Sequence, residues 1–425
     1  MPDGSASVDL YRPKLATTLS EGYSLDHFRK DALAALTVAV VALPLSMAIA
    51  VASGVSPARG LYTAIIGGAL VSALSGSRYQ IGGPAGAFIV LVAATVARFG
   101  VEGLLLAVLM SGAMLTLVGL LRLGSLIRHI PHPVTVGFTC GIAITILASQ
   151  LKELGGLQLA HEPGPLVPKF VALGQALGTV NPAALAIGLG SAALIFLLKR
   201  LRPNWPGMLI AVAAASLVAF AFGLHVETIG TRFGELPHGM LAPRLPSMSP
   251  ALLLMMLPSA LSFTLLGGVE SLLSAKVADS MTGRKHRSNM ELVGQGIANI
   301  GSALFGGICV TGTIARTATN VRAGARTPVS GILHSVFLLL FMLVAAPLAS
   351  YVPLAALAGV LVAVCWNMAE KKEFWRLLGD VPSAAVLFAT FGITLLWNLT
   401  AGIVAGCLVA ALFALFRKFV PEEGD

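Results

Sequence analysis

Residues 306–320 read GGICVTGTIARTATN, a polar, glycine-rich stretch within an otherwise apolar part of the chain. Lipid cannot satisfy exposed backbone N–H and C=O groups, so irregular backbone at membrane depth must be buried in protein or line a watery cavity. A helix that begins there directs unpaired N–H groups and its positive dipole end into that cavity. Because Arg316 adds a guanidinium one turn into the helix, the stretch predicts a pocket for an anion.

The composition around this stretch is that of a membrane protein with many spans. Hydrophobic residues make up 56% of the 425 residues and charged residues only 11%, whereas a soluble domain carries about 25% charged residues. The mean hydropathy is +0.87. The net charge of +9 lies in short loops between apolar segments, and without a basic, aromatic-interleaved module it does not indicate nucleic-acid binding.

The pattern predicts an all-α polytopic membrane protein with 14 transmembrane segments, several of them shorter than the ~20 residues that a lone span needs. We expect a cytoplasmic N-terminal segment (1–31), with a short interfacial helix over 24–30, and an extracytoplasmic linker (224–249). A first set of seven spans (32–223) lies between these two segments. A second set of seven spans (250–418) follows the linker, and a cytoplasmic tail (419–425) comes last. The expected spans are 32–51, 59–75, 85–98, 103–121, 134–151, 181–198, 205–223, 251–275, 290–305, 313–325, 328–347, 353–367, 381–397 and 401–417.

The distribution of basic residues predicts the orientation. With a cytoplasmic N-terminus, 21 of the 28 Lys and Arg residues fall in inner loops, six in outer loops, and Arg316 remains within the membrane. Inner loops carry such an excess of Lys and Arg in membrane proteins. We therefore expect both termini in the cytoplasm.

Seven spans in each half place the second half upside down relative to the first, as in transporters built from inverted repeats. The third span of each half fits this plan. Residues 79–84 precede a helix expected to start near Ala85, and residues 308–312 precede one expected near Thr313. Glycine pairs alone favour close helix packing, but two pairs at equivalent positions predict discontinuous third and tenth spans that face one another.

Two charged residues fall well inside the apolar segments, Glu270 and Arg316, whereas Asp279 and Glu291 are placed at span ends where interfacial solvation suffices. Charges within the membrane mark function by default. Arg316 is expected to attract an anion and Glu270 to act as a coupling site for a proton. The alternative is a structural ion pair between these two residues.

Other polar residues give weaker signals. Thr311 and Thr313 could contact substrate or hydrogen-bond to backbone, and His334 is expected to pack or bridge helices rather than relay protons. No metal and no cofactor is expected, because the four cysteines lie far apart, without metal-ligand or disulfide spacing, and are expected as buried apolar residues. An intramembrane enzyme would need a nucleophile with a base, or a metal cluster, and no such spacing is present.

The chain resembles the sulfate permease (SulP) family, whose animal relatives include prestin and pendrin, and the resemblance implies a bacterial member located in the inner membrane. The motifs that carry the resemblance cover nearly the whole chain: Ala42-Leu43-Pro44, Gly60-Leu61-Tyr62, Gly82-Gly83-Pro84, Pro131 to Phe138, Glu270 to Ser274, Ala278-Asp279 and Gly306 to Asn320. The resemblance implies a fold shared with nucleobase transporters, in which a core domain (spans 1–4 and 8–11) moves against a gate domain (spans 5–7 and 12–14) in elevator fashion.

The resemblance also implies the substrate site. Leu45 and Ile49 of the first span, Ala85 of the third, and Ala315 and Arg316 of the tenth would line it. Gly86 and Thr313, at the two half-helix starts, complete the predicted substrate-binding set. Many relatives carry Gln at the position of Leu45, and many animal members carry Ser at that of Ala315. Because fewer polar side chains line the site, the case for sulfate specificity is weaker.

The expected function is secondary active transport of a small anion. The candidates are a dicarboxylate such as fumarate, sulfate or bicarbonate, carried by symport with a proton or sodium, in a homodimer. An uncoupled exchanger or channel and a nucleobase transporter on the same fold stay open as alternatives. The arginine disfavours the nucleobase carrier, since such carriers tend to use an acid there. Most family members carry a cytoplasmic STAS domain after the last span, and we expect its absence here, by nature or by truncation.

Overall fold

The computed structural model describes residues 11–124, 131–159, 163, 166–203, 205–237, 239–397 and 399–419. Eight helical stretches in this part are long and apolar enough to cross a membrane, and three shorter apolar helices accompany them. The elements of the first half are α2 (Lys14–Ser20), α3 (Leu25–Ala52), α4 (Pro57–Tyr62), the π-helical turn η1 (Thr63–Gly67), α5 (Gly68–Leu74), β1 (Gly82–Gly83), the 3₁₀ turn η2 (Gly86–Phe88), α6 (Ile89–Leu120), α8 (His132–Gly155), α9 (Leu166–Gln175), the 3₁₀ turn η3 (Leu177–Thr179), α10 (Pro182–Leu201), α11 (Gly207–Ala221) and α12 (Ile229–Phe233).

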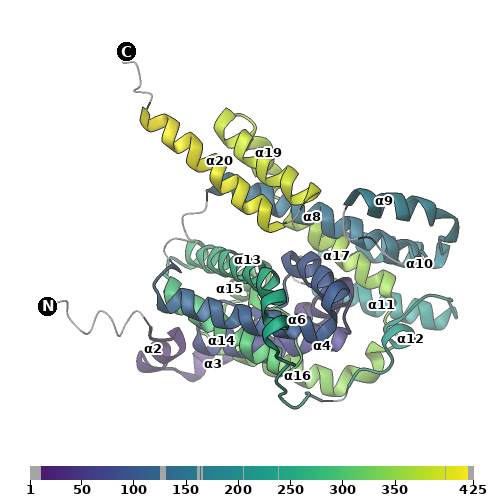
Figure 1. Ribbon diagram of the computed structural model, residues 1–425. Helices are drawn as coiled ribbons and strands as arrows, with labels where there is room; N and C mark the ends of the chain where they lie inside the picture. The colour runs from purple at the N-terminus through teal and green to yellow at the C-terminus, as the bar shows by residue number, and fades with distance from the viewer. Residues whose placement is uncertain are drawn as a thin grey trace.

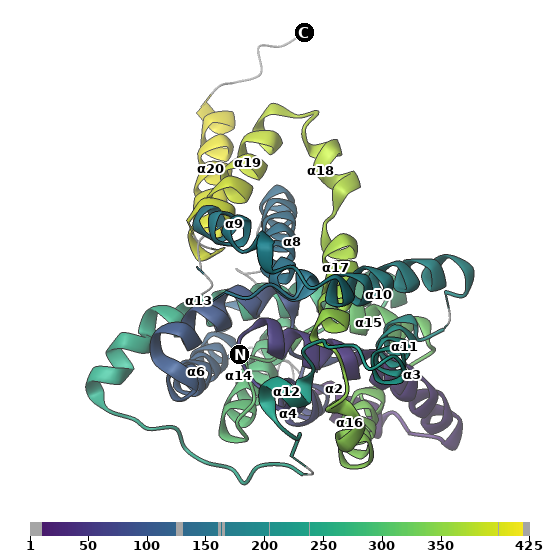
Figure 2. The ribbon, with the colours of Figure 1, turned by 90° about the vertical axis from the view of Figure 1, so that its right-hand side faces the viewer.

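The second half continues with α13 (Pro250–Thr282), α14 (Ser288–Leu304), β2 (Thr311–Gly312), α15 (Ile314–Arg322), α16 (Val329–Ala349), α17 (Leu354–Met368), α18 (Lys371–Leu377), α19 (Val381–Leu396) and α20 (Leu399–Phe419). The helices form two groups (Figure 1). In the first bundle, α3–α6 pack with α13–α16; in the second bundle, α8, α10 and α11 pack with α17, α19 and α20. Figure 2 shows α8, α19 and α20 standing beside the first bundle, and α17 packs against α3 where the two bundles meet.

Each of the fourteen apolar segments expected from the sequence coincides with helix, although the boundaries differ. The interfacial helix expected over 24–30 is wrong as a separate element, because these residues begin α3. Ser24 caps that helix by accepting a hydrogen bond from the backbone N–H of His27. The expected third and fourth spans both lie largely in α6. This helix is kinked at Gly100, whose backbone is non-helical with φ 67° and ψ −173°. The short helices α9, α12 and α18 were not expected.

The segment 224–249, expected as an exposed linker, is partly built into the second bundle. Ile229 and Leu236 are buried, and the N–H of Ile229 donates to the carbonyl of Val352 at 2.9 Å. Arg232 on α12 contacts Glu227 and Glu153. Burial works to lower the pKa of Arg232, but its hydrogen bonds to these two carboxylates outweigh that effect and raise it. The contact with Glu153 fixes α12 against the end of α8.

One charge expected in the cytoplasmic lead-in is fully buried. Asp31, on α3, accepts hydrogen bonds from the backbone N–H groups of Arg326 (2.7 Å) and Thr327 (3.1 Å) and from the Thr327 hydroxyl. Tyr23 donates its hydroxyl to the same carboxylate at 3.1 Å. Asp31 therefore ties the start of α3 to the turn between α15 and α16, next to the arginine-bearing helix.

Candidate functional site

The two broken spans meet through a short antiparallel pairing of β1 and β2, in which Gly82 pairs with Gly312 and Gly83 with Thr311. After each strand the chain turns into a helix: η2 and α6 begin past Ala85, and α15 begins past Thr313. The helix starts therefore lie where the sequence predicted them. Because the strands are antiparallel and adjacent, the two helices leave the same crossing point in opposite directions.

Side chains of neighbouring helices hold the extended backbone before α15. Asn299 on α14 accepts from the N–H of Val310 at 3.0 Å and donates to its carbonyl at 2.8 Å. The Thr63 hydroxyl accepts from the N–H of Ile308 at 2.7 Å, and Ser302 donates to the carbonyl of Ile308 at 2.6 Å. These polar residues satisfy backbone groups that lipid would leave unpaired, and the glycine-rich entry is thereby fixed.

Arg316 lies at the centre of the crossing and is 2% exposed. Its Nη2 donates to the Ser46 hydroxyl at 3.1 Å and to the carbonyl of Pro84 at 3.4 Å. Its Nε and Nη1 have no hydrogen-bond partner among the described residues. A buried donor without a partner is costly, and more so when it carries charge. The guanidinium is thus held from two directions while part of its hydrogen-bonding capacity is left for another group.

The other predicted substrate-binding residues differ in burial. Leu45, Ile49 and Ala85 are buried, Gly86 is half-buried, and Ala315 is exposed. A Cβ built on Gly86 would lie 3.6 Å from Cδ1 of Ile146 on α8, so this glycine faces the second bundle. The broken spans and α8 therefore approach one another at Gly86.

Thr313 belongs to the crossing itself. Its N–H and its hydroxyl both donate to the carbonyl of Ile81, at 3.0 and 3.2 Å. The Thr317 hydroxyl accepts from the N–H of Ile81 at 3.1 Å and from the Ser274 hydroxyl at 3.1 Å. The sequence left open whether these threonines contact substrate or hydrogen-bond to backbone. The contacts of Thr313 with the carbonyl of Ile81 are of the second kind. A role for Thr313 as a substrate ligand stays a prediction.

Glu270 lies on α13 and is half-buried, and its Oε2 has no hydrogen-bond partner among the described residues. The next residue of α13, Ser271, contacts the crossing, where its hydroxyl and that of Thr311 hydrogen-bond at 2.7 Å. The ion pair between Glu270 and Arg316, which the sequence left open as a structural alternative, is not formed between these two described side chains. Glu270 and Arg316 are therefore not partners of each other in this structure.

The expectation that Glu291 is solvated at a span end is wrong. Glu291 is fully buried on α14, and Gln295 and Asn299 follow it on the same face, also fully buried. Gln295 donates to Glu291 at 3.3 Å. Their spacing of four residues places the three side chains on one helix face, but it does not say whether that face is buried. His334 is also fully buried, and within the described chain neither of its ring nitrogens has a hydrogen-bond partner.

Ser46 was also not predicted as part of the site, although it lies two residues after Pro44, the end of the Ala42-Leu43-Pro44 motif of the first span. The residue is fully buried and contacts the guanidinium. A serine inside an apolar helix ordinarily hydrogen-bonds its own backbone, so the sequence alone gave no reason to single it out.

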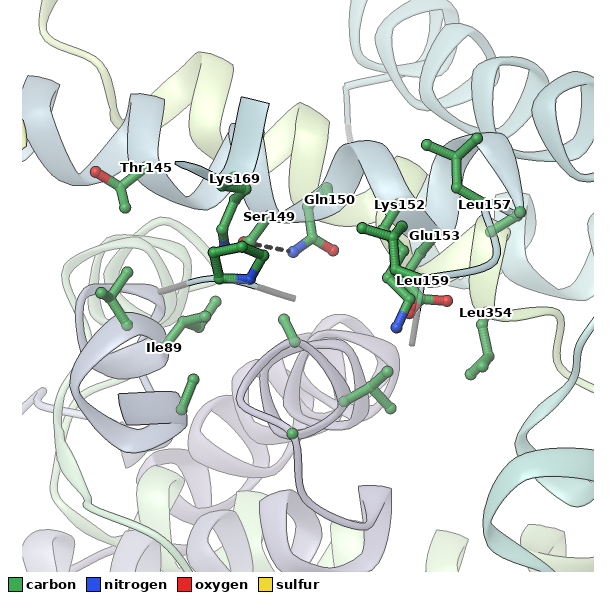
Figure 3. A pocket seen from close by; sticks show the side chains of 18 of the residues that line it. Ile89, Thr145, Ser149, Gln150, Lys152, Glu153, Leu157, Leu159, Lys169 and Leu354 are labelled. Atoms are coloured by element: carbon green, nitrogen blue, oxygen red, sulfur yellow. Dashed lines mark hydrogen bonds between the residues drawn. The ribbon is translucent and has the colours of Figure 1, made fainter. Parts of the chain in front are cut away.

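A cavity of about 1240 Å³ opens between the two bundles, beside this site rather than around it. Polar side chains of α8 line one wall, including Thr145, Ser149 and Gln150, and Ile89 lies opposite, as Figure 3 shows. Ile89 is the first residue of α6, three positions after Gly86. The cavity therefore reaches to within one helical turn of the predicted site, and Lys152 and Lys169 also line it.

Residues 28–390 match the model of the sulfate permease family. The chain belongs to the sulfate permease family. It is 44% identical over 399 residues to a Bacillus subtilis protein provisionally named sulfate transporter YvdB, covering 93% of this chain and 75% of that protein. It is 32% identical to the bicarbonate transporter BicA of Picosynechococcus sp., covering 92% of this chain and 71% of the relative.

Solved structures agree with the fold. The transmembrane domain of a cyanobacterial bicarbonate transporter BicA matches with a TM-score of 0.81 and 31% identity, covering 90% of this chain and 98% of that one. Murine solute carrier 26 family member A9, an anion transporter, matches with a TM-score of 0.87 at 19% identity, over 98% and 73% of the two chains. This sulfate permease family member is thus a multi-pass membrane anion transporter and not an enzyme.

Proposed function

We propose that this protein carries a small anion across the bacterial plasma membrane by secondary active transport, with Arg316 as the residue that binds the anion. The observation that carries the proposal is the Arg316 guanidinium, buried at the crossing of the two broken spans with Nε and Nη1 unpartnered in the described chain. A bound anion compensates a buried charge at such a place. The positive dipole ends of the helices that start at the crossing add to the attraction.

The neighbouring residues would select by size and charge more than by many hydrogen bonds. Leu45, Ile49 and Ala85 offer no polar side-chain atom, and the Thr313 hydroxyl already donates to the carbonyl of Ile81. Sulfate and bicarbonate are the first candidates, because the relatives named above carry those names. A dicarboxylate such as fumarate is a further candidate that fits a single arginine.

Glu270 is the candidate coupling residue. A carboxylate in a membrane-spanning helix without a cationic partner is expensive when ionised, so its occupancy by a proton or a sodium ion can be linked to transport. The two ions make different demands, since sodium needs several oxygen ligands whereas a proton needs only the carboxylate. The Ser271 and Thr311 hydroxyls lie beside this part of α13.

Alternating access would come from movement of one bundle against the other. The first bundle carries Arg316, Glu270 and both broken spans, and the second bundle faces them with α8 and α17. We infer that these bundles correspond to the core and gate domains of an elevator mechanism, built from two inverted repeats of seven spans with both termini in the cytoplasm. A homodimer is part of the same proposal.

Uptake into proteoliposomes tests the function directly. Labelled sulfate, bicarbonate and fumarate are offered separately, with an imposed pH gradient, an imposed sodium gradient, or neither. Concentrative uptake of one anion under one gradient supports coupled transport and names both ions. Uptake that only equilibrates under every gradient contradicts coupling and supports the alternative of an uncoupled exchanger or channel.

A further inference from the structure

Helix α9 exposes apolar side chains and buries its lysine, the opposite of what is expected for a helix on a water-exposed surface. Its lysine, Lys169, is 7% exposed, whereas Val167, Phe170 and Val171 are 62, 48 and 56% exposed. Leu173 lies on the inner face with Lys169. A helix that faces water carries its charged residues outward and its apolar residues toward the protein, so the outer face of α9 does not fit contact with water.

The position of α9 points to the environment of that outer face. The helix packs against α8 and α19, and Lys169 lines the cavity between the bundles together with Trp397, which follows α19. Trp397 is 81% exposed. Tryptophan at the end of an apolar helix typically lies at the boundary between membrane and water, which places α9 at that level.

The length and surroundings of α9 exclude a spanning role. Ten residues form about 15 Å of helix, half of the hydrocarbon thickness. Leu177 follows α9 with 62% exposure, and α10, which begins soon after, exposes Leu185 and Leu189. The exposed apolar residues of α9 therefore lead, along the chain, into those of a membrane-spanning helix.

We propose that α9 is an interfacial helix, lying in the plane of the membrane with Val167, Phe170 and Val171 among the lipids at the headgroup–acyl boundary. Amphipathic helices bind this boundary by burying an apolar face in it. In this arrangement α9 forms the wall between the lipid and the cavity. It holds Lys169 on the cavity side, so that lipid and cavity adjoin opposite faces of α9.

Depth-dependent fluorescence quenching tests this placement in the full chain in proteoliposomes. Val171→Cys is labelled with an environment-sensitive fluorophore and exposed in turn to lipids spin-labelled near the headgroup, lipids spin-labelled deep in the acyl chain, and aqueous iodide. Leu189→Cys, on spanning helix α10, and Glu235→Cys, exposed in the segment between the halves, are the matched controls. The unsubstituted chain measures background labelling of the four native cysteines, three of them buried.

The label at Val171 should show blue-shifted emission, stronger quenching by the shallow than by the deep spin label, and a loss of most of the iodide quenching seen at Glu235. Iodide quenching equal to that at Glu235 would overturn the proposal, because the face would then lie in water. Quenching by neither lipid nor iodide would overturn it too, because another protein surface, such as a second copy of the chain, would then cover the face.

Discussion

A Cβ atom built on Gly83 would lie 2.0 Å from Nη1 of Arg316. The backbone of the third span therefore touches the guanidinium of the tenth, and only a glycine permits that approach. Nη2 of the same side chain reaches Ser46 on the first span. The arginine is thus placed by three spans that lie far apart in the sequence, and its position depends on the absence of a side chain at residue 83.

Substituting Gly83→Ala should remove most transport while leaving the chain folded. The added methyl must displace the guanidinium, which is the far end of a flexible side chain, so the fold tolerates the change while the anion-binding group moves out of position. Initial uptake rates in proteoliposomes, with folding checked by size-exclusion chromatography, measure the effect. Gly190→Ala is the matched control, since no atom of the described residues lies within 4 Å of its Cβ position. Equal activity of the two variants would show that the close contact has no functional weight.

Glu270→Gln should separate transport from its driving ion. The amide keeps the shape of the side chain but cannot bind a proton, and it binds a cation more weakly. We expect the variant to exchange labelled anion across the membrane without concentrating it under the effective gradient. Counterflow and gradient-driven uptake, measured side by side, distinguish these results. A variant that still accumulates anion against its gradient would remove Glu270 from the coupling role.

Asp31→Asn should destabilise the protein by about 2–4 kcal/mol, because hydrogen bonds to a charged group contribute about 1.5–3 kcal/mol each and Asp31 accepts several. A thermal-unfolding scan in detergent would show a lower melting temperature. Asp26→Asn is the control, since its ion pair with Lys30 at 2.6 Å is solvent-exposed and such pairs contribute about 0–1 kcal/mol. Equal melting temperatures for the two variants would contradict the structural role of Asp31.

The sequence predicted the helical segments well because each is long, apolar and bounded by polar loops. It also predicted the two extended glycine-rich entries and the helix starts that follow them, since polar backbone at equivalent positions must be held by protein within a membrane. Helix ends were less predictable. Residues 24–30 continue α3 because Ser24 supplies a cap, and their polarity concealed this. Helix α9 was not predicted, because its apolar stretch is short and lies between two predicted spans.

Burial of individual polar residues could not be read from the chain. Glu291 sits near a basic loop in the sequence, yet α14 turns it toward the protein interior together with Gln295 and Asn299. The contact of Ser46 with Arg316 spans 270 residues and depends on how three helices cross. Long-range contacts of this kind arise from packing, and no local pattern encodes them.

Anion uptake by Arg316 variants tests the central claim most directly. The rate of uptake of the preferred anion by Arg316→Met should fall on the order of 100-fold, because losing one partner of a buried charge pair costs about 2–5 kcal/mol. Arg316→Lys should retain part of the rate, since it keeps the charge without the planar fork. Undiminished uptake by a folded Arg316→Met variant would contradict the assignment of the anion site.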